Sequence, residues 1–296
     1  MNIKKKISSL IDKIEEHNLN YYIKDSPIIS DYEYDLLLRQ LEGLEKKYPE
    51  LIQSSSPTQR VGVSPNQEFG TIKHSIPMLS LSNAMSESEV IQFDDQVKKL
   101  LKTESNIEYV AEPKLDGVAI EVVYRNGIFL HGSTRGDGMV GEEISSNIKT
   151  IKSIPLRLFN DSSPPELLEL RGEVFIKKSN FKNLNNDRAK DGQSIFANTR
   201  NCASGSLRQI DSKVTSDRPL DVNFYGCGSV IGYEFNSQSN FINKIPNWGF
   251  PVNSLIQTGS GLDFILSYYR KMEEIRQSLD YDIDGVVFKV NSFDFQ

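Results

Sequence analysis

The chain has 296 residues, of which 38% are hydrophobic and 25% are charged, and its formal net charge is −6 at pH 7. This is an ordinary globular composition with enough length for one large and one smaller domain. The acidic balance gives no support for nucleic-acid binding through bulk charge, although a local basic groove stays open. The two cysteines and three histidines show no CxxC or HxxxH spacing, which argues against a zinc site within this stretch.

The first predicted elements are two helices. The first helix carries apolar residues at helical spacing, namely Ile3, Ile7, Leu10, Ile11 and Ile14. The second helix begins after Ser30, which can form a capping box with Glu33, and ends before Pro49. Residues 54–67 have the composition of a loop. We therefore predict a small helical domain over residues 1–68 and a larger mixed domain over residues 69–296.

From Tyr109 onward the sequence is rich in β-branched and aromatic residues and predicts strands. Asn126-Gly127 separates two strand-like runs and is a strong hairpin signal. Further strands are predicted within residues 168–176, 220–234 and 281–296, and a helix from Leu262 to Ile275. Because strands and helices interleave without a strict βαβ alternation, the predicted fold class is α+β with largely antiparallel sheets.

Lys114 lies in the stretch EPKLDG and is a candidate nucleophile. Residues two apart in an extended segment share a face, so Glu112, Lys114 and Asp116 are expected to point the same way. The Asn-Gly hairpin would return Arg135 towards the start of the first strand. A nearby cation would lower the pKa of a lysine and free its lone pair, and Lys289 is a candidate for that cation or for a phosphate ligand. A lone K-x-D-G motif is more often a turn after a strand, so the motif by itself leaves both interpretations open.

Several longer motifs follow one another along the sequence. They are SPTQRVG, HSIPMLSLSNA, EPKLDGVA, STRGDGMVGEEISSNIKTI, LRGEVF, FANTRNCASGSLRQ, NFYGCG and DIDGVVFKV. In this order the sequence resembles the bacterial NAD-dependent DNA ligases over essentially the whole chain. The resemblance implies a nucleotidyltransferase (adenylation) domain of the ATP-grasp-like ligase class. It also implies a small all-α domain before it that recognises the nicotinamide mononucleotide half of NAD.

The resemblance assigns the chemistry to a few positions. Lys114 matches the family lysine that attacks the α-phosphate of NAD, which gives lysyl-AMP and releases nicotinamide mononucleotide. Asp116 and Asp284 match further catalytic positions, with Asp284 assigned to the metal or to the lysine, and Lys289 matches a contact to the α-phosphate. Mg²⁺ or Mn²⁺ is expected because phosphoryl-type transfer requires charge neutralisation on the non-bridging oxygens.

The same resemblance assigns residues to the adenosine half of NAD. Glu112 matches a contact to the adenine, Tyr225 an aromatic ring that stacks on the base, Glu173 a carboxylate at the ribose and Arg135 a nucleotide-binding arginine. Further positions in or around the family's site are occupied by Ser80, Leu81, Arg200 and Arg208. Without the motifs around them, Tyr225 could equally be a core residue and the two arginines of that list surface ion pairs.

The N-terminal helices carry a second group of candidates. Asp31 and Asp35 are four residues apart on the first turn of the second helix, with Tyr34 beside them and Tyr21 and Tyr22 upstream. Two carboxylates at this spacing repel each other, and a cationic pyridinium ring would offset that repulsion. From the pattern alone these residues could be helix-start acids and core tyrosines, but the resemblance implies that they bind the nicotinamide half. Many relatives have a histidine at the position of Tyr22.

The resemblance also predicts what surrounds this part of the family enzyme. After the position of Gln296 the family continues into another lysine-bearing motif, an oligonucleotide-binding barrel, a four-cysteine zinc module, helix-hairpin-helix motifs and a BRCT domain. The chain is thus expected to be a fragment competent at most for self-adenylation, with zinc only in the remaining part. In the intact enzyme the AMP passes to the 5′-phosphate of nicked double-stranded DNA, during DNA replication and repair.

The sequence predicts a cytoplasmic monomer with no membrane partner. The residues after Met1 lack the apolar core of a signal peptide, and no apolar run approaches the roughly 20 residues that a membrane span requires. Two alternatives stay open. An ATP- or GTP-dependent nucleotidyltransferase would share the lysine without needing the N-terminal tyrosines and aspartates. A non-catalytic dinucleotide-binding module would bind NAD without forming a covalent adduct.

Overall fold

The computed structural model describes residues 3–22, 26, 28–60, 68–159 and 163–296. The helices are α1 (Ile3–Tyr22), α2 (Asp31–Lys47), α3 (Glu87–Leu101), α4 (Ser145–Ile148), α5 (Lys178–Lys190), α6 (Thr199–Leu207), α7 (Ser212–Ser216), α8 (Gln238–Lys244) and α9 (Gly261–Ile275). The strands are β1 (Thr71–Lys73), β2 (Glu108–Leu115), β3 (Val118–Arg125), β4 (Ile128–Thr134), β5 (Val140–Glu142), β6 (Leu167–Ile176), β7 (Leu220–Ile231), β8 (Gln257–Ser260) and β9 (Ile283–Val290). Within these described residues, no helix has the length and apolar character needed to cross a bilayer.

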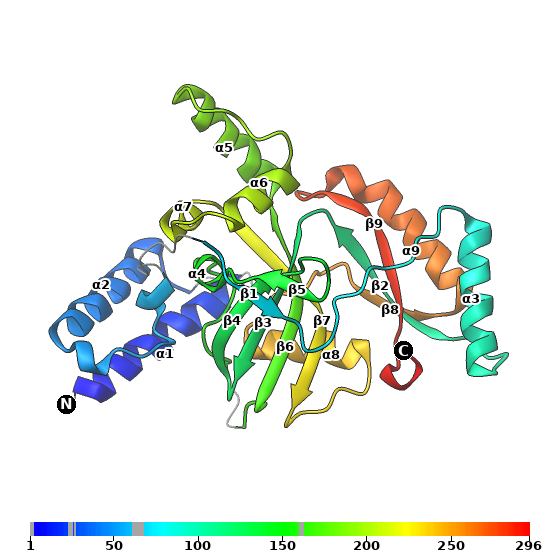
Figure 1. Ribbon diagram of the computed structural model, residues 1–296, viewed down its shortest axis with the longest axis horizontal. Coiled ribbons are helices and arrows are strands. Elements are labelled where there is room, and N and C mark those ends of the chain that lie inside the picture. The colour runs from blue at the N-terminus through cyan, green and yellow to red at the C-terminus, as the bar shows by residue number, and fades with distance from the viewer. Residues whose placement is uncertain (1–2, 23–25, 27, 61–67, 160–162) are drawn as a thin grey trace.

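Helices α1 and α2 form a separate helical part at one end of the molecule (Figure 1). The apolar stripe predicted for α1 packs on Leu41 of α2 in a small buried cluster. Ser30 caps α2 as predicted, because its Oγ accepts from the amide of Glu33 while the Glu33 carboxylate accepts from the amide of Ser30. The boundary predicted between residues 68 and 69 directly follows residues 61–67, which lie outside the described residues.

Two arginines attach the helical part to the rest of the protein. Arg157 of the larger body pairs with Asp12 at 2.6 Å and with the buried Glu15 at 2.7 Å, both on α1. Arg60, which follows α2, donates to three backbone carbonyls within residues 149–154. Because a guanidinium has several donors in a fixed fork, each arginine can hold more than one acceptor at the same time.

The larger body is built on antiparallel sheets, as predicted. The strand order is β4-β3-β6-β7 in a four-stranded sheet, β8-β2-β9 in a three-stranded sheet and β1-β5 in a short pair. The largest apolar core covers one face of the four-stranded sheet, where residues such as Ile120, Leu170 and Phe224 pack with Trp248. The predicted hairpin is present between β3 and β4, and Asn126 and Gly127 have φ values of 49° and 77°. Positive φ at both residues is what a two-residue type I′ turn requires.

The prediction treated the residues from Tyr109 to the Asn126-Gly127 turn as one extended run, but the structure divides them into two strands. Strand β2 ends at Leu115 and β3 begins at Val118, and the two strands belong to different sheets. Asp116 therefore lies in the connection, beyond the strand face that Glu112 and Lys114 share. Arg135 returns to the start of β3 and not to the start of β2, because its amide donates to the carbonyl of Ala119 at 3.1 Å.

Gly117 makes this connection possible. A Cβ at this position would lie 2.2 Å from the carbonyl oxygen of Val174 on β6 and 3.0 Å from the Cγ of Glu173. Contacts this short with backbone atoms cannot be relieved by a side-chain rotation. The chain can therefore turn from one sheet to the next against β6 only because residue 117 has no side chain.

We expect Gly117→Ala to destabilise the protein by about 2 kcal/mol, because the added methyl group forces the backbones of β3 and β6 apart. Urea unfolding followed by circular dichroism measures the change. Gly43→Ala is the matched control, since nothing lies within 4 Å of a Cβ at that exposed position of α2. There the same substitution should stabilise by up to about 1 kcal/mol. Equal effects at the two positions would contradict the close approach at Gly117.

Candidate active site

Lys114 lies near the end of β2, the central strand of the three-stranded sheet. Its Nζ atom is 2.6 Å from Oδ2 of Asp284 on the neighbouring strand β9, and the two side chains are 40% and 39% exposed. The pairing follows from the register, which places Lys114 opposite Gly285. Both side chains are thus held against each other and are also open to a ligand, as a nucleophile and its proton acceptor need to be.

The four-stranded sheet and α6 bring further charges to the same place. Arg200 on α6 pairs with Asp116 at 2.8 Å. Burial raises the pKa of Glu173 on β6 to about 7, while the charges of Arg200 and Lys114 and a hydrogen bond from the amide of Gly117 act in the opposite direction. Two cations and three carboxylates therefore meet between the two sheets. Carboxyl groups with raised pKa values of this kind are frequent in ligand-binding clefts.

A second ion pair lies deeper in the same region. Lys289 on β9 pairs with Glu112 on β2 at 2.7 Å, and the Glu112 side chain is only 7% exposed. Burial raises the pKa of Glu112, and the charge of Lys289 acts in the opposite direction. The other carboxylate oxygen, Oε2, is buried and has no hydrogen-bond partner among the described residues. An orphaned buried acceptor is rare in native proteins and indicates a place for a donor from a ligand.

Tyr225 on β7 adds an aromatic surface next to this pair. The Nζ atom of Lys289 lies 5.1 Å from the centre of the Tyr225 ring and donates to the Tyr225 carbonyl at 2.7 Å. Burial raises the pKa of Tyr225, so the phenol is neutral. Lys289 was predicted to act on Lys114 or on a phosphate, and the structure instead pairs it with Glu112. A Cβ on Gly285 or Gly226 would meet nothing within 4 Å, so both sheets have room beside these groups.

The remaining predicted residues of the larger body lie on the edge of this region. Arg135 is exposed. Burial raises the pKa of Tyr225, and the positive charge of Arg135 acts in the opposite direction, so Arg135 lies within electrostatic reach of that ring. Ser80 and Leu81 are exposed in the segment between β1 and α3. Arg208 pairs with Glu142 at 2.6 Å, away from the other predicted side chains.

The predicted nicotinamide-binding residues are not brought to Lys114. Tyr34 is half-buried, its hydroxyl donates to Asn18 at 2.9 Å, and its ring packs against the core between α1 and α2. Asp35 is exposed on α2, and Tyr21 is 52% exposed near the end of α1. These positions fit the core-tyrosine alternative for Tyr34 and leave the other two side chains accessible.

The candidates on the helical part and those around Lys114 lie in different parts of the molecule (Figure 1). Helices α1 and α2 lie at one end of the molecule beside α4 and α7, whereas β2 and β9 lie towards the other end. The side chains of Tyr22 and Asp31, which were also predicted to bind the nicotinamide half, lie outside the described part of the structure. The structure therefore shows one cluster of predicted site residues in the larger body, around Lys114 and Glu112, and a separate group in the helical part.

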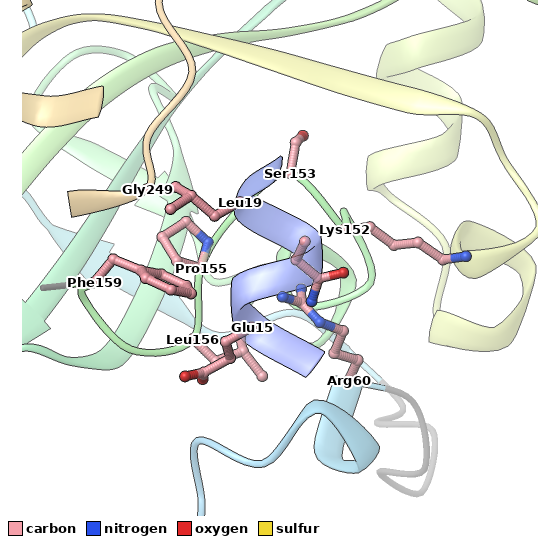
Figure 2. Close-up of a pocket in the computed structure, with 10 residues that line it drawn as sticks. Glu15, Leu19, Arg60, Lys152, Ser153, Pro155, Leu156, Phe159 and Gly249 are labelled. Atoms are coloured by element: carbon pink, nitrogen blue, oxygen red, sulfur yellow. The ribbon is translucent and has the colours of Figure 1, made fainter. Parts of the chain in front are cut away.

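A small pocket lies where α1 meets the larger body (Figure 2). It is lined by residues that include Glu15, Leu19, Arg60, Lys152, Pro155 and Phe159. Burial raises the pKa of Glu15, and the charge of Arg157 acts in the opposite direction. None of the predicted site residues lines this pocket, so it belongs to the attachment of the helical part and not to the candidate active site.

The described residues do not form a ready metal site. Among them, no three His, Cys, Asp or Glu side chains come together in a way that could hold a metal ion. Asp284 is paired with Lys114 and Asp116 with Arg200. Mg²⁺ usually binds proteins through one or two carboxylates together with substrate phosphates and water, so these carboxylates fit a metal that arrives with a phosphate ligand.

Sequence reasoning missed one charged residue beside the site. Arg171 lies two residues before Glu173 on β6, and its charge reaches Tyr225, whose pKa it lowers. The signal was present in the motif LRGEVF, because alternate residues of a strand share a face. Glu169, Arg171 and Glu173 form such an alternating charged row, opposite the apolar residues Leu168 and Leu170.

Comparison with known proteins identifies the family. Residues 66–296 match the NAD-dependent DNA ligase adenylation domain, and residues 1–62 match the DNA ligase-like, N-terminal NAD+-binding domain. The chain belongs to the NAD-dependent DNA ligase family. The family label agrees with the resemblance inferred from the motifs, and the larger body is its adenylation domain.

Curated relatives named DNA ligase match nearly the whole chain. The protein of Geotalea uraniireducens (strain Rf4) is 52% identical over 294 residues, which cover 99% of this chain and 44% of that protein. The protein of Geotalea daltonii is 52% identical over 293 residues and that of Geobacter sulfurreducens 50% over 293 residues, each covering 98% of this chain and 44% of the relative. The chain thus spans less than half of the length of these relatives.

The raised pKa of Glu173 predicts how the stability of the adenylation domain changes with pH. Between its ordinary value of 4.5 and about 7, the folded protein holds this proton and the unfolded chain releases it. Stability therefore falls as pH rises through that window and then levels off. Glu173→Gln removes the cost of ionising a buried carboxyl group. The variant should therefore be more stable than the parent chain at pH 8, by up to about 3 kcal/mol, and nearly equal to it at pH 4.5.

Urea unfolding at both pH values measures this difference. The exposed Glu166 provides the control, because Glu166→Gln should change stability by a similar small amount at pH 4.5 and at pH 8. A Glu173→Gln variant whose stability difference from the parent chain does not grow with pH would show that the carboxyl group is not held neutral by burial.

Proposed function

We propose that the adenylation domain, residues 69–296 with a nucleotidyltransferase fold, transfers AMP from NAD to its own Lys114. The Nζ atom attacks the α-phosphorus, so a nitrogen–phosphorus bond forms and the phosphorus–oxygen bond to nicotinamide mononucleotide breaks. The Lys114 ammonium group gives up two of its three protons, one of which the Asp284 carboxylate can accept and the other water, and nicotinamide mononucleotide leaves with the electron pair of the broken bond. The observation that carries this proposal is the half-exposed Lys114–Asp284 pair, with nitrogen and oxygen 2.6 Å apart, on the same two strands as Glu112, whose buried Oε2 has no partner among the described residues.

Asp284 is the group placed to prepare the lysine. Its carboxylate is in hydrogen-bond contact with the amine, so it can orient Lys114 and accept a proton from it. Arg200, already near Asp116 and Glu173, adds a positive charge where the phosphate of NAD would carry negative charge. Asp116 holds that arginine in place through a contact of 2.8 Å.

The buried Glu112–Lys289 pair and the Tyr225 ring beside it suit the adenosine half of NAD. The free Oε2 atom of Glu112 can accept a hydrogen bond from the amino group of an adenine, and Tyr225 offers a ring face for stacking. Glu173 can bind the hydroxyl groups of the ribose. Arg135 is proposed to contact the nucleotide from the edge, while Lys289 fixes Glu112 and is in reach of the α-phosphate only if it leaves that carboxylate.

Outer contacts complete the proposed binding site. Ser80 and Leu81 would touch NAD from the segment between β1 and α3, and Arg208 would act at the margin. Mg²⁺ or Mn²⁺ would bind through the phosphates of NAD with Asp116 or Asp284, and it would neutralise charge on the non-bridging oxygens. In this proposal no zinc is needed by the described residues.

The helical part is proposed to recognise the nicotinamide mononucleotide half of NAD. Tyr21, Tyr22, Tyr34, Asp31 and Asp35 combine aromatic rings with carboxylates, which is suitable for a cationic pyridinium ring. Support comes from the match of residues 1–62 to an N-terminal NAD+-binding domain. Because α1 and α2 lie away from β2 and β9 in Figure 1, contact with a dinucleotide bound at Lys114 requires the helical part to move.

The activity of the whole protein is the last part of the proposal. We propose that the AMP on Lys114 is passed to the 5′-phosphate at a nick in double-stranded DNA, and that the adjacent 3′-hydroxyl then displaces AMP and seals the strand. The relatives named DNA ligase, which match over nearly all of this chain, support this role in replication and repair. We also propose that the protein acts in the cytoplasm and as a monomer.

Intact-protein mass spectrometry after incubation with NAD or with ATP, each with Mg²⁺, tests the self-adenylation step. We expect one AMP adduct with NAD, none with ATP, and none with Lys114→Ala, because the attacking atom is then missing. Lys190→Ala is the matched control, since Lys190 pairs with Asp187 on the surface of α5. Equal labelling by ATP would reject the NAD assignment, and binding of NAD without any adduct would favour a non-catalytic binding module.

A second variant tests the helical part in the full-length ligase. We expect Asp35→Ala to lower the rate of attack on NAD by at least tenfold, because a carboxylate near the cationic ring is lost. The same variant should seal a pre-adenylated nick at the parent rate, since that substrate carries no nicotinamide. Gel assays of the two reactions measure the rates. An equal loss in both reactions would contradict the nicotinamide role.

A further inference from the structure

The segment of residues 74–78, here called the strap, crosses the four-stranded sheet on the side that faces away from the apolar core. Figure 1 shows the chain passing from β1 across the strands of this sheet to α3. The strap directly precedes Leu79, Ser80 and Leu81, which are exposed. Its polar anchors are side chains of β3 and β6, and the proposed function gives none of them a role.

His74 begins the strap and is fully buried. Its Nδ1 atom lies 2.8 Å from a carboxylate oxygen of Glu121 on β3, and its Nε2 atom lies 3.1 Å from the carbonyl oxygen of Arg135. His74 thereby connects the strap to the turn that carries Arg135.

Arg171 holds the middle of the strap. It lies opposite Glu121 in the pairing of β3 with β6, and its Nε atom donates to Glu121 at 3.2 Å. Its two terminal nitrogens donate to the carbonyls of Pro77, at 3.2 Å, and of Ile76. Three acceptors in different directions require the fixed fork of a guanidinium, which a lysine does not have.

A third anchor lies beside these two. Glu169 on β6 accepts from the hydroxyl of Ser75 in the strap and, at 2.8 Å, from the amide of Ser229 on β7. Glu169, Arg171 and Glu173 alternate along β6, so the strand face that presents Glu173 to the cleft also carries the anchors of the strap. The strap is thus held by the same strand, β6, that carries Glu173.

The anchors are not part of the apolar core. Ile120 and Val122 flank Glu121 on β3, Leu170 precedes Arg171 on β6, and these apolar side chains point into the buried cluster on the opposite face of the sheet. The sheet can therefore keep its core when one of the charged anchors is altered. The network of His74, Arg171 and Glu121 thus adds little to the apolar core. It connects the strap and the turn that carries Arg135 to β3 and β6, which points to a role in placing these two segments.

We propose that Arg171, Glu121 and His74 are positioning residues that hold Ser80, Leu81 and the Arg135 turn in the arrangement that binds NAD. The inference rests on the proposed self-adenylation of Lys114. The network touches neither Lys114 nor Asp284, so its loss should weaken NAD binding and leave the chemical step almost unchanged. This separates it from Lys114 and Asp284, whose replacement removes the step itself.

Arg171→Lys tests the proposal in this chain. Single-turnover labelling of Lys114 is followed by mass spectrometry over a range of NAD concentrations with Mg²⁺. Because the lysine cannot serve all three acceptors, we expect the half-saturating NAD concentration to rise about tenfold or more, as for the loss of a charged hydrogen bond. The maximal rate should stay within about threefold, since the reacting groups are untouched.

Two further variants complete the test. Arg188→Lys is the matched control, because Arg188 on α5 also donates to a backbone carbonyl, that of Ser194 at 2.7 Å. In this variant the half-saturating NAD concentration and the maximal rate should both stay unchanged. Ser75→Ala removes one exposed anchor and should raise half-saturation by about threefold, in keeping with the loss of one neutral hydrogen bond. If Arg171→Lys does not fold, as judged by circular dichroism, Ser75→Ala decides the matter.

The outcomes separate the two proposals. Unchanged half-saturation in folded Arg171→Lys and Ser75→Ala, or a fall in maximal rate alone, would overturn the positioning role while leaving self-adenylation intact. Absence of any adduct in the parent chain would overturn the proposed function. In that case calorimetry with NAD compares the dissociation constants of the same variants, and equal constants would overturn the positioning role as well.

Discussion

The close approach of Gly117 to the carbonyl of Val174 is the contact on which the candidate active site depends. It allows β2 and β3, separated by two residues, to enter different sheets. Lys114 can then come from one sheet and Glu173 from the other, close enough for the charge of Lys114 to act on the Glu173 carboxyl group. A side chain at residue 117 would push the strands apart and separate the proposed nucleophile from the groups proposed to hold its substrate.

The elements that depend on neighbouring residues could be predicted from the sequence. The capping box at Ser30 and the turn at Asn126-Gly127 are encoded by a few adjacent residues, and both are present. The break after Leu115 could not be predicted, because the residues on both sides favour strands and the group that enforces the break, Val174, lies far away in sequence. Helix α3 was not predicted, although Ser86 caps it and its apolar residues Val90, Phe93, Val97 and Leu101 pack in one cluster.

The site residues were predicted through the family motifs, which also offered Asp284 as a partner of the lysine, whereas the pairing of Lys289 with Glu112 was not predicted. Spacing along a strand can place Lys114 and Glu112 on one face, but it cannot show that Asp284 meets the first and Lys289 the second. Those partners come from β9, and the register between two distant strands decides them. The place of Tyr34 and Asp35 was beyond prediction for a similar reason, because the arginines at 60 and 157 fix where the helical part attaches.

The ion pairs Lys114–Asp284 and Lys289–Glu112 differ in burial, and therefore in how easily their partners separate. A half-exposed pair such as Lys114–Asp284 contributes roughly 1 kcal/mol or less, because water solvates either partner when they separate. The lysine can therefore leave its carboxylate for a phosphorus atom at small cost. Glu112 and Lys289 are mostly shielded from water, and removing one partner would leave a buried charge uncompensated. The deep pair is thus suited to recognise a ligand without changing, and the outer pair is suited to react with it.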